Sequence, residues 1–276
     1  MSKITQPLKW HGGKHYLAPK IIALMPKHTH YVEPYAGGLS VMLAKDPEGV
    51  SEVANDINGP LTNFWRCMAC RASFEAFERQ AQAIPFCETL WAQALEKVSK
   101  PCDASDMICQ SCALAFFVVC RQSLAGRMTN FAPLSKTRVR RGMNEQASAW
   151  MNAVDGLPEV HARLRRVAIL NRPALDVIRQ QDAPDTLFYL DPPYLHETRA
   201  TTGEYAHEMS YEQHAELLDV LRSIKGKFML SGYRSQLYDS AASEAGNWRL
   251  HQFELPNNSA AGKSKRRMVE ALWCNF

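Results

Sequence analysis

The sequence lacks the features of a membrane or secreted protein. It has no apolar run long enough to span a bilayer and no signal-peptide pattern at its N-terminus. We therefore expect a cytoplasmic protein without a membrane segment. Internal repeats and low-complexity tracts are also missing, and a net charge of +4 is too small by itself to indicate a polyanionic partner. The chain has 276 residues, 46% of them hydrophobic, and can bury a substantial core.

Eight cysteines are present, and in a cytoplasmic protein they are expected to be free thiols. The pairs Cys67/Cys70 and Cys109/Cys112 have the spacing of zinc ligands. Both pairs fall in segments of helical, aromatic-rich character, without the glycine-containing turns of zinc knuckles. We therefore interpret them as small buried side chains and predict no metal site, with zinc as the alternative.

The most informative segment is residues 186–190 followed by Asp191, Pro192, Pro193 and Tyr194. A short apolar, aromatic-rich run bounded by prolines is typical of a buried strand. The two prolines end the strand and restrict the backbone that follows. This pattern predicts a carboxylate at the carboxyl end of a central strand, which is where ligands bind in open α/β sheets.

The four residues after this strand suit chemistry on the exocyclic amine of a nucleobase. Such an amine is a poor nucleophile, because its lone pair is delocalised into the ring. The Asp191 carboxylate and the Pro192 carbonyl oxygen can accept its two N–H bonds, and Tyr194 offers a flat base a stacking surface. The alternative is an ordinary strand and turn with a solvated aspartate.

A second ligand-binding pattern lies nearer the N-terminus. Residues 30–35 predict a strand that leads through Gly37 and Gly38 into a helix, an arrangement that directs helix N–H groups at a ligand. Residues 53–56 predict the next strand, and Asp56 at its end is placed like the acid that binds ribose hydroxyls in nucleotide-binding folds. A plain turn around Asp56 is the alternative. A nucleotide-binding oxidoreductase is the weakest alternative, because the G-x-G-x-x-G spacing is missing.

The middle of the chain differs from both ends. Helical periodicity dominates residues 61–165, whereas strand patterns resume at residues 167–170 and 227–232. Two further strands are predicted at residues 248–255 and 268–276. The chain therefore predicts an α/β frame with a mainly helical insertion.

Taken together, the motifs resemble those of the Dam-type (class D12) DNA adenine-N6 methyltransferases, which use S-adenosylmethionine. The likeness spans nearly the whole chain and rests on five motifs in order: residues 8–14, 33–38, 55–56, 191–194 and 228–233. It implies an α/β, Rossmann-like S-adenosylmethionine-dependent methyltransferase fold with an inserted, mainly helical target-recognition domain. The implied domains are residues 1–60 with 166–276 for catalysis, and residues 61–165 for DNA recognition.

The resemblance also implies roles for individual residues. Asp191, Pro192, Pro193 and Tyr194 become the catalytic residues that hold a flipped-out adenine, and Asp191 can also contact the ammonium group of the cofactor. The remaining implied cofactor contacts are Trp10 and Lys14 at the amino-acid end, Glu33, Tyr35 and Gly37 around the sulfonium, and Asp56 at the ribose.

The DNA contacts are predicted from residue type and clustering. Arginine reads guanine and asparagine reads adenine in the major groove, although both also bind phosphate alone. A lysine and arginine cluster in a glycine- and asparagine-rich loop fits a phosphate clamp. The predicted contacts are Arg121, Arg127, Asn130, Arg138, Lys263, Lys265 and Arg266. Residues 123–131 depart from the recognition hairpin of GATC-specific members, so the sequence does not predict the recognition sequence.

The resemblance predicts an enzyme that acts on double-stranded DNA as a monomer or weak dimer. Related alternatives are methylation of RNA adenine or of cytosine N4, and a DNA-binding relative without activity. The aspartate at 191 favours adenine over cytosine, because cytosine enzymes more often carry serine there. The long helical insertion favours DNA over RNA. The sequence does not show the preference for unmodified or half-modified duplex, or whether the protein serves a phage, a restriction system or a regulatory circuit.

Overall fold

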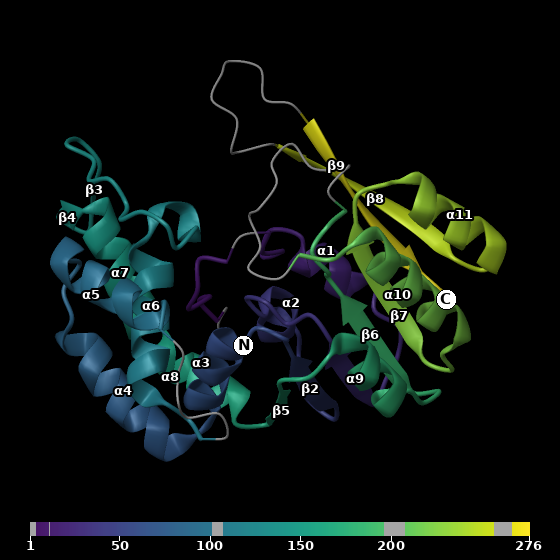
Figure 1. Cartoon of the computed structure of the whole chain (residues 1–276), viewed down its shortest axis with the longest axis horizontal. Helices are drawn as coiled ribbons and strands as arrows, with labels where there is room; N and C mark the ends of the chain where they lie inside the picture. The colour runs from purple at the N-terminus through teal and green to yellow at the C-terminus, as the bar shows by residue number, and fades with distance from the viewer. Residues whose placement is uncertain (1–3, 11, 101–106, 196–207, 257–266) are drawn as a thin grey trace. The chain divides into compact units, whose positions relative to one another are not determined.

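A computed structural model describes residues 4–276 except residues 11, 101–106, 196–207 and 257–266 (Figure 1). The chain forms two compact units. The helical unit comprises Met1–Met25, Gly37–Glu48 and Asn58–Asn171, and the sheet unit comprises Pro26–Ala36, Gly49–Ile57 and Arg172–Phe276. The helical unit thus contains two N-terminal segments that the sequence assigned to the catalytic domain. The assignment of functions to domains stays a prediction.

The helical unit contains most of the α-helices, drawn in purple, blue and teal in Figure 1. Its elements are α1 (Ala18–Ala23), α2 (Ser40–Ala44), α3 (Gly59–Ala69), α4 (Arg71–Ala83), α5 (Glu88–Val98), α6 (Gln110–Gln122), η1 (Leu124–Gly126), β3 (Val139–Arg140), β4 (Met143–Asn144), α7 (Glu145–Asp155), α8 (Leu157–Leu164) and β5 (Val167–Leu170).

Aromatic side chains form the core of the helical unit. Phe64 of α3 stacks on Phe117 of α6 with ring centroids 5.7 Å apart, and Phe77 of α4 packs edge-on against Phe64 at 5.9 Å. All three side chains are fully buried. Helix α3 begins where the Asn58 side chain accepts a hydrogen bond from the backbone N–H of Leu61, so a local cap fixes its start.

The sheet unit contains the other elements: β1 (His30–Glu33), β2 (Ser51–Asn55), α9 (Ala174–Gln181), β6 (Thr186–Leu190), α10 (Tyr211–Ser223), β7 (Lys227–Gly232), α11 (Gln236–Ala245), β8 (Arg249–Pro256) and β9 (Arg267–Cys274). The strands of this unit form one sheet in the order β2-β1-β6-β7-β9-β8. Its mostly parallel pairing is that of a Rossmann-like methyltransferase fold, as predicted.

Strand β6 occupies the centre of the sheet. It pairs in parallel with β1 on one side and with β7 on the other, and all five of its residues are buried. The predicted limits of this strand, 186–190, are those of the structure, and so are the limits predicted for β5 and β7. The antiparallel strands β8 and β9 complete the order next to β7.

A buried asparagine holds the backbone at the ends of β1 and β2. The Asn55 amide nitrogen donates to the carbonyl oxygens of Pro34 (2.9 Å) and Arg172 (3.0 Å). Its side-chain oxygen accepts from the Arg172 backbone N–H (3.0 Å), and its own carbonyl accepts from the N–H of Ala36 (2.8 Å). This side chain is 1% exposed, so it fixes the turn after β1 from inside the protein.

Among the described residues, no helix is both long enough and apolar enough to cross a membrane.

Replacing Asn55 with alanine should lower the free energy of unfolding by about 2–4 kcal/mol, because buried backbone groups lose their partners. Urea unfolding followed by circular dichroism measures this change. Asn130→Ala is the control, since its exposed side chain donates only to Thr129 among the bonds of the structure, and it should change stability by less than about 0.5 kcal/mol. Equal effects of the two substitutions would show that the Asn55 bonds do not stabilise the fold.

Candidate active site

Four parallel strands of the sheet unit end at one edge of the sheet. The strands β2, β1, β6 and β7 are neighbours and run in the same direction. Glu33 is the last residue of β1, Asp56 follows β2, Asp191 follows β6 and Tyr233 follows β7. Three carboxylates predicted from the sequence as site residues therefore gather at the carboxyl edge, which is the ligand-binding edge of such sheets.

Asp191 and Tyr194 lie together at the centre of this edge. Asp191 is half-buried, whereas Tyr194 is 7% exposed. The Tyr194 hydroxyl lies 3.3 Å from Asp191 Oδ1 and also donates to Glu270 Oε1. Its ring packs edge-on against Tyr233, with centroids 4.8 Å apart. Two prolines separate Asp191 from Tyr194 in the sequence. Pro192 is buried and Pro193 is half-buried.

Burial raises the pKa of Tyr194 well above its ordinary value, and the neighbouring carboxylates Asp191 and Glu270 raise it further. Each of these causes penalises the phenolate. The Tyr194 hydroxyl therefore keeps its proton at neutral pH and acts as a hydrogen-bond donor.

Glu33 is held at the end of β1 by a neighbour on the same strand. It is 2% exposed, and its Oε1 accepts a hydrogen bond from the Tyr31 hydroxyl (2.8 Å). Burial raises the pKa of Tyr31, and Glu33 is the next cause. Because residues two apart on a strand point to the same face, this pairing follows from the β1 conformation.

Tyr35 and Asp56 lie within electrostatic reach of one another. Burial raises the pKa of the half-buried Tyr35, and the nearby charge of Asp56 raises it further. Burial raises the pKa of Tyr238 on α11, and Tyr35 and Asp191 are the next causes that raise it. Tyr238 is therefore near both Tyr35 and the centre of the edge. The structure therefore brings the predicted residues Glu33, Tyr35, Asp56, Asp191 and Tyr194 into one region of the sheet unit.

Comparison with known protein families agrees with this geometry. A model of the D12 class N6 adenine-specific DNA methyltransferases matches residues 10–256. The chain belongs to this family. It is an enzyme that methylates adenine N6 at specific sites in DNA. The chain is also similar to the type II methyltransferase M1.LlaDCHI of Lactococcus lactis subsp. cremoris, with 25% identity over 283 residues that cover 97% of this chain and 94% of the relative.

The other predicted cofactor contacts of this D12 methyltransferase lie in its helical unit. Trp10 packs on the glycine pair: a Cβ on Gly37 would lie 2.7 Å from Trp10 Nε1, and a Cβ on Gly38 would lie 2.7 Å from Trp10 Cβ. Gly37 also has a φ of +46°, which favours glycine. Lys14 is 8% exposed, and its Nζ donates to the carbonyl oxygen of Gly12 (2.9 Å).

A cavity of about 500 Å³ lies in the helical unit of the methyltransferase. Two cationic side chains, Lys9 and Arg121, line it together with Trp10. Arg121 is half-buried and one terminal nitrogen donates to the carbonyl oxygen of Ala149 (2.7 Å). Lys9 Nζ donates to Gln146 Oε1 (3.3 Å). Arg121 was predicted from the sequence as a site residue and Lys9 was not, although the position of Lys9 next to Trp10 in the first motif was an available signal.

Residues 122–132 form a closed loop rather than an open segment. Ser123 and Phe131 form an antiparallel bridge, and the N–H of Leu124 donates to the carbonyl oxygen of Asn130 (2.9 Å). Arg127 and Asn130, both predicted DNA contacts, are exposed on this loop.

A glycine connects this loop to the first motif. Gly126 has a φ of +74°, and a Cβ there would collide with the carbonyl oxygen of Lys9. No other residue fits without a backbone shift, so close packing fixes the base of the loop against the Lys9 backbone.

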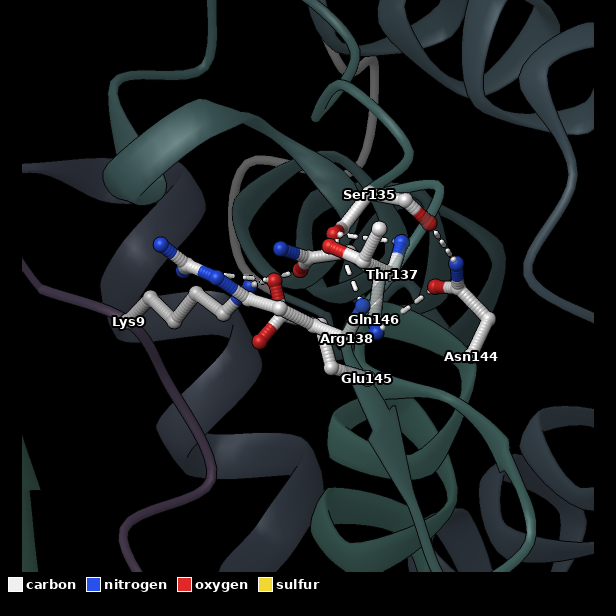
Figure 2. A network of polar contacts seen from close by, with 7 residues as sticks. All are labelled: Lys9, Ser135, Thr137, Arg138, Asn144, Glu145 and Gln146. Atoms are coloured by element: carbon white, nitrogen blue, oxygen red, sulfur yellow. Dashed lines mark hydrogen bonds and ion pairs between the residues drawn. The ribbon is translucent and has the colours of Figure 1, made fainter.

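Arg138 belongs to a polar network at the N-terminus of α7 (Figure 2). Its guanidinium lies 3.5 Å from the Glu145 carboxylate, and its backbone N–H donates to Ser135 Oγ (3.0 Å). Asn144 donates to the Ser135 carbonyl oxygen (3.1 Å) and accepts from the Gln146 N–H (2.9 Å). The exposed Arg138 side chain is therefore carried by an anchored segment.

The predicted phosphate contacts Lys263, Lys265 and Arg266 lie outside the described residues. Seven cysteines of the described part of the chain are free thiols, and burial raises the pKa of Cys67 to about 12. Within the same part of the chain, no group of three or more His, Cys, Asp or Glu side chains is arranged to hold a metal.

Sequence reasoning missed two further side chains at the carboxyl edge, Tyr238 and Glu270. Tyr238 accepts or donates a hydrogen bond with His214 Nδ1 (2.8 Å) and packs on Trp273 at 5.0 Å. Glu270 is 4% exposed on β9. The available signal for Glu270 was an acid within the otherwise apolar residues 268–274.

The Lys9 ammonium should titrate near pH 8. Burial, and next the positive charge of Arg121, lower the pKa of Lys9 to about 8. NMR titration of ¹³C-methylated lysines, assigned by comparison with Lys9→Arg, measures the midpoint. Arg121→Gln should raise it and Glu145→Gln should lower it, because Glu145 favours the charged form. A wild-type midpoint near the ordinary value of about 10.4 would contradict the burial of Lys9 in this cavity.

Proposed function

We propose that the protein transfers a methyl group from S-adenosylmethionine to N6 of an adenine flipped out of double-stranded DNA. The observation that carries this proposal is the half-buried Asp191 carboxylate at the carboxyl end of β6, with the protonated Tyr194 hydroxyl 3.3 Å away. Base flipping is required, because the amine of a stacked and paired adenine cannot reach an acceptor at the edge of a sheet.

The acidic carboxyl edge fits this methyl donor. S-adenosylmethionine carries a sulfonium and an ammonium charge and donates hydrogen bonds from its ribose hydroxyls. The carboxylates of Glu33, Asp56 and Asp191 offer acceptors and negative charge at that edge. We assign Asp56 to the ribose, and Glu33 with Tyr35 to the surroundings of the sulfonium. For Trp10, Lys14 and Gly37 the family resemblance alone supports a role at the cofactor.

The donor supplies an electrophilic methyl group on a positively charged sulfur. Asp191 and the carbonyl oxygen of Pro192 accept the two N–H bonds of the target amine, which draws its lone pair out of conjugation and aims it at the methyl carbon. S-adenosylmethionine would supply the methyl carbon for the new C–N bond, and its sulfur would take up the electrons of the C–S bond and become neutral. The nitrogen then carries one proton too many, and Asp191 is the group of this chain that already holds one of its N–H bonds.

The surrounding residues position the base rather than react with it. Pro192 and Pro193 restrict the backbone that follows β6, so the carboxylate and the carbonyl oxygen stay in a fixed relation. The Tyr194 ring is the proposed stacking surface for the adenine, worth roughly 1–3 kcal/mol. Its contact with Tyr233 holds the ring at the site.

The proposed DNA contacts lie on the helical unit. Arg127 and Asn130 are exposed on the closed loop of residues 122–132, and Arg138 is exposed directly before β3. Arg121, whose guanidinium lines the cavity, is the fourth proposed contact. Lys263, Lys265 and Arg266 remain predicted phosphate contacts on the basis of sequence alone.

The name of the Lactococcus lactis relative suggests the biological setting. That protein is named a type II methyltransferase, and we infer for this chain a role in a restriction–modification system. A cytoplasmic location and action as a monomer or weak dimer complete the proposal.

Asp191→Asn should lower kcat by at least about 100-fold, because the amide cannot accept both an N–H bond and the proton that leaves N6. The assay incubates DNA with labelled cofactor and separates the nucleosides after digestion, where wild-type label should appear in N6-methyladenine. DNA affinity should stay within about threefold of the wild type.

Asp185→Asn is the matched control, since Asp185 is exposed just before the opposite end of the same strand. It should leave kcat unchanged. Wild-type label in N4-methylcytosine would contradict the proposed role of Asp191 at an adenine amine, and a parallel loss of DNA binding and turnover in Asp191→Asn would indicate a role in folding.

Arg127→Gln should weaken DNA binding and, if Arg127 contacts one phosphate, reduce the slope of log K against log salt by about 0.9. The measurement is a fluorescence-anisotropy titration at several salt concentrations, with DNA whose methylated adenines have been mapped. Arg222→Gln is the control, because Arg222 pairs with Asp219 and Glu244 on the sheet unit. An unchanged slope with a loss restricted to the methylated sequence would assign Arg127 to a base instead.

A further inference from the structure

Lys9 and Arg121 bring two positive charges to one cavity of the helical unit. The cavity measures about 500 Å³ and is partly open to solvent, and Trp10 and Ala125 also line it. Burial lowers the pKa of Lys9, and the positive charge of Arg121 is the next cause. The two cations therefore lie within electrostatic reach of one another.

Contacts of the backbone keep these two residues together. The Cys120 thiol donates to the carbonyl oxygen of Lys9 (3.3 Å), and Gly126 packs so closely on the same carbonyl that a Cβ would collide with it. Arg121 follows Cys120 on α6 and donates to the carbonyl oxygen of Ala149 (2.7 Å). The fold thus holds the cations near one another although their charges repel.

Both cations have more donors than the protein satisfies. A guanidinium has five N–H donors and an ammonium has three. Among the described residues, the Arg121 side chain forms one hydrogen bond, and its buried Nε has no partner. Lys9 Nζ forms one bond, of 3.3 Å, to Gln146 Oε1 (Figure 2). Because buried polar groups are almost always paired, these donors indicate an acceptor that the protein does not supply.

The negative charge near the cavity is already shared. Glu145 favours the charged form of Lys9, but its carboxylate also lies 3.5 Å from the Arg138 guanidinium. Within the described part of the chain, neither Lys9 nor Arg121 forms an ion pair with a carboxylate. Positive charges withdrawn from water without a counter-charge are costly, and a bound anion offsets this cost.

We propose that Lys9 and Arg121 form a site for a phosphate group, which either the DNA backbone or a free phosphate ion supplies. A tetrahedral oxyanion accepts hydrogen bonds from an ammonium and a guanidinium at the same time. The cavity has room for a phosphate group with water around it. The site does not depend on the role of Asp191. Only the DNA source rests on the proposed function, in which Arg121 contacts DNA.

Calorimetric titration of the whole protein with inorganic phosphate tests the site, at pH 7 and constant ionic strength. We expect saturable binding. Lys9→Gln and Arg121→Gln should each weaken it by about tenfold or more, because each substitution removes a charge-assisted hydrogen bond. Arg141→Gln is the matched control and should change the affinity by less than about twofold. Arg141 is an exposed arginine of the same unit that lies 3.5 Å from Asp155 and does not line the cavity.

The conservative variant Lys9→Arg separates loss of charge from misfolding. It keeps the positive charge, so its phosphate affinity should stay within about fivefold of the wild type. Circular dichroism shows which variants fold, and if Arg121→Gln does not fold, Lys9→Gln decides. A wild type that does not bind phosphate, or a folded Lys9→Gln variant with wild-type affinity, would overturn the proposal.

The Lys9 titration midpoint is a second measurement of the same site. An anion that binds the charged ammonium more tightly than the neutral amine raises its pKa. A tenfold preference corresponds to one pH unit, so saturating phosphate should raise the midpoint by about one unit or more. NMR titration with and without phosphate measures this shift. An unchanged midpoint would contradict contact between Lys9 and the phosphate.

Repeating the phosphate titration with protein saturated with duplex DNA distinguishes the two sources. Loss of phosphate binding would assign the site to a phosphodiester of the DNA, and unchanged binding would assign it to a free phosphate ion. The methylation product is measured separately. A protein that binds phosphate at Lys9 and Arg121 without forming N6-methyladenine would contradict the proposed function and retain this site, whereas the reverse result would contradict only the site.

Discussion

Parallel pairing of β2, β1, β6 and β7 is the constraint on which the rest of the site depends. Parallel strands deliver their carboxyl ends to one edge, so an acid after each strand becomes a neighbour of the others without any contact in sequence. Negative charges arranged in this way repel one another, and tyrosine hydroxyls next to the carboxylates reduce this repulsion. The Tyr31 hydroxyl donates to Glu33, and the Tyr194 hydroxyl lies 3.3 Å from Asp191 Oδ1. Burial keeps both phenols protonated. The edge remains acidic enough for a cationic donor and yet consists of hydrogen-bonded groups.

Much of this arrangement could be predicted from local sequence. The strand at residues 186–190 had the limits that the structure gives it, because an apolar run bounded by prolines leaves little freedom in where a buried strand ends. The acid that follows it was then placed at the edge by topology alone. The position of Asp56 at the edge could be predicted in the same way. Its charge raises the pKa of Tyr35, which agrees with the two residues lying near one another.

The remaining parts depend on contacts that local sequence does not encode. The sequence placed Asn55 at the end of a strand, but its local pattern did not predict that the residue is 1% exposed and hydrogen-bonds to Pro34 and to Arg172, which is 117 residues away. Lys9 was missed for a similar reason: its environment is made by Arg121 and Gln146, which only tertiary packing brings near. The loop of residues 122–132 closes through backbone hydrogen bonds, and such bonds cannot be predicted from the residue composition of the segment.

Glu270 shows what selection for stability alone would not retain. A buried carboxylate is costly to desolvate, and an apolar residue of similar volume on β9 would commonly be neutral or stabilising. A buried acid persists where it has a specific partner, and here the partner is the hydroxyl next to the proposed catalytic carboxylate.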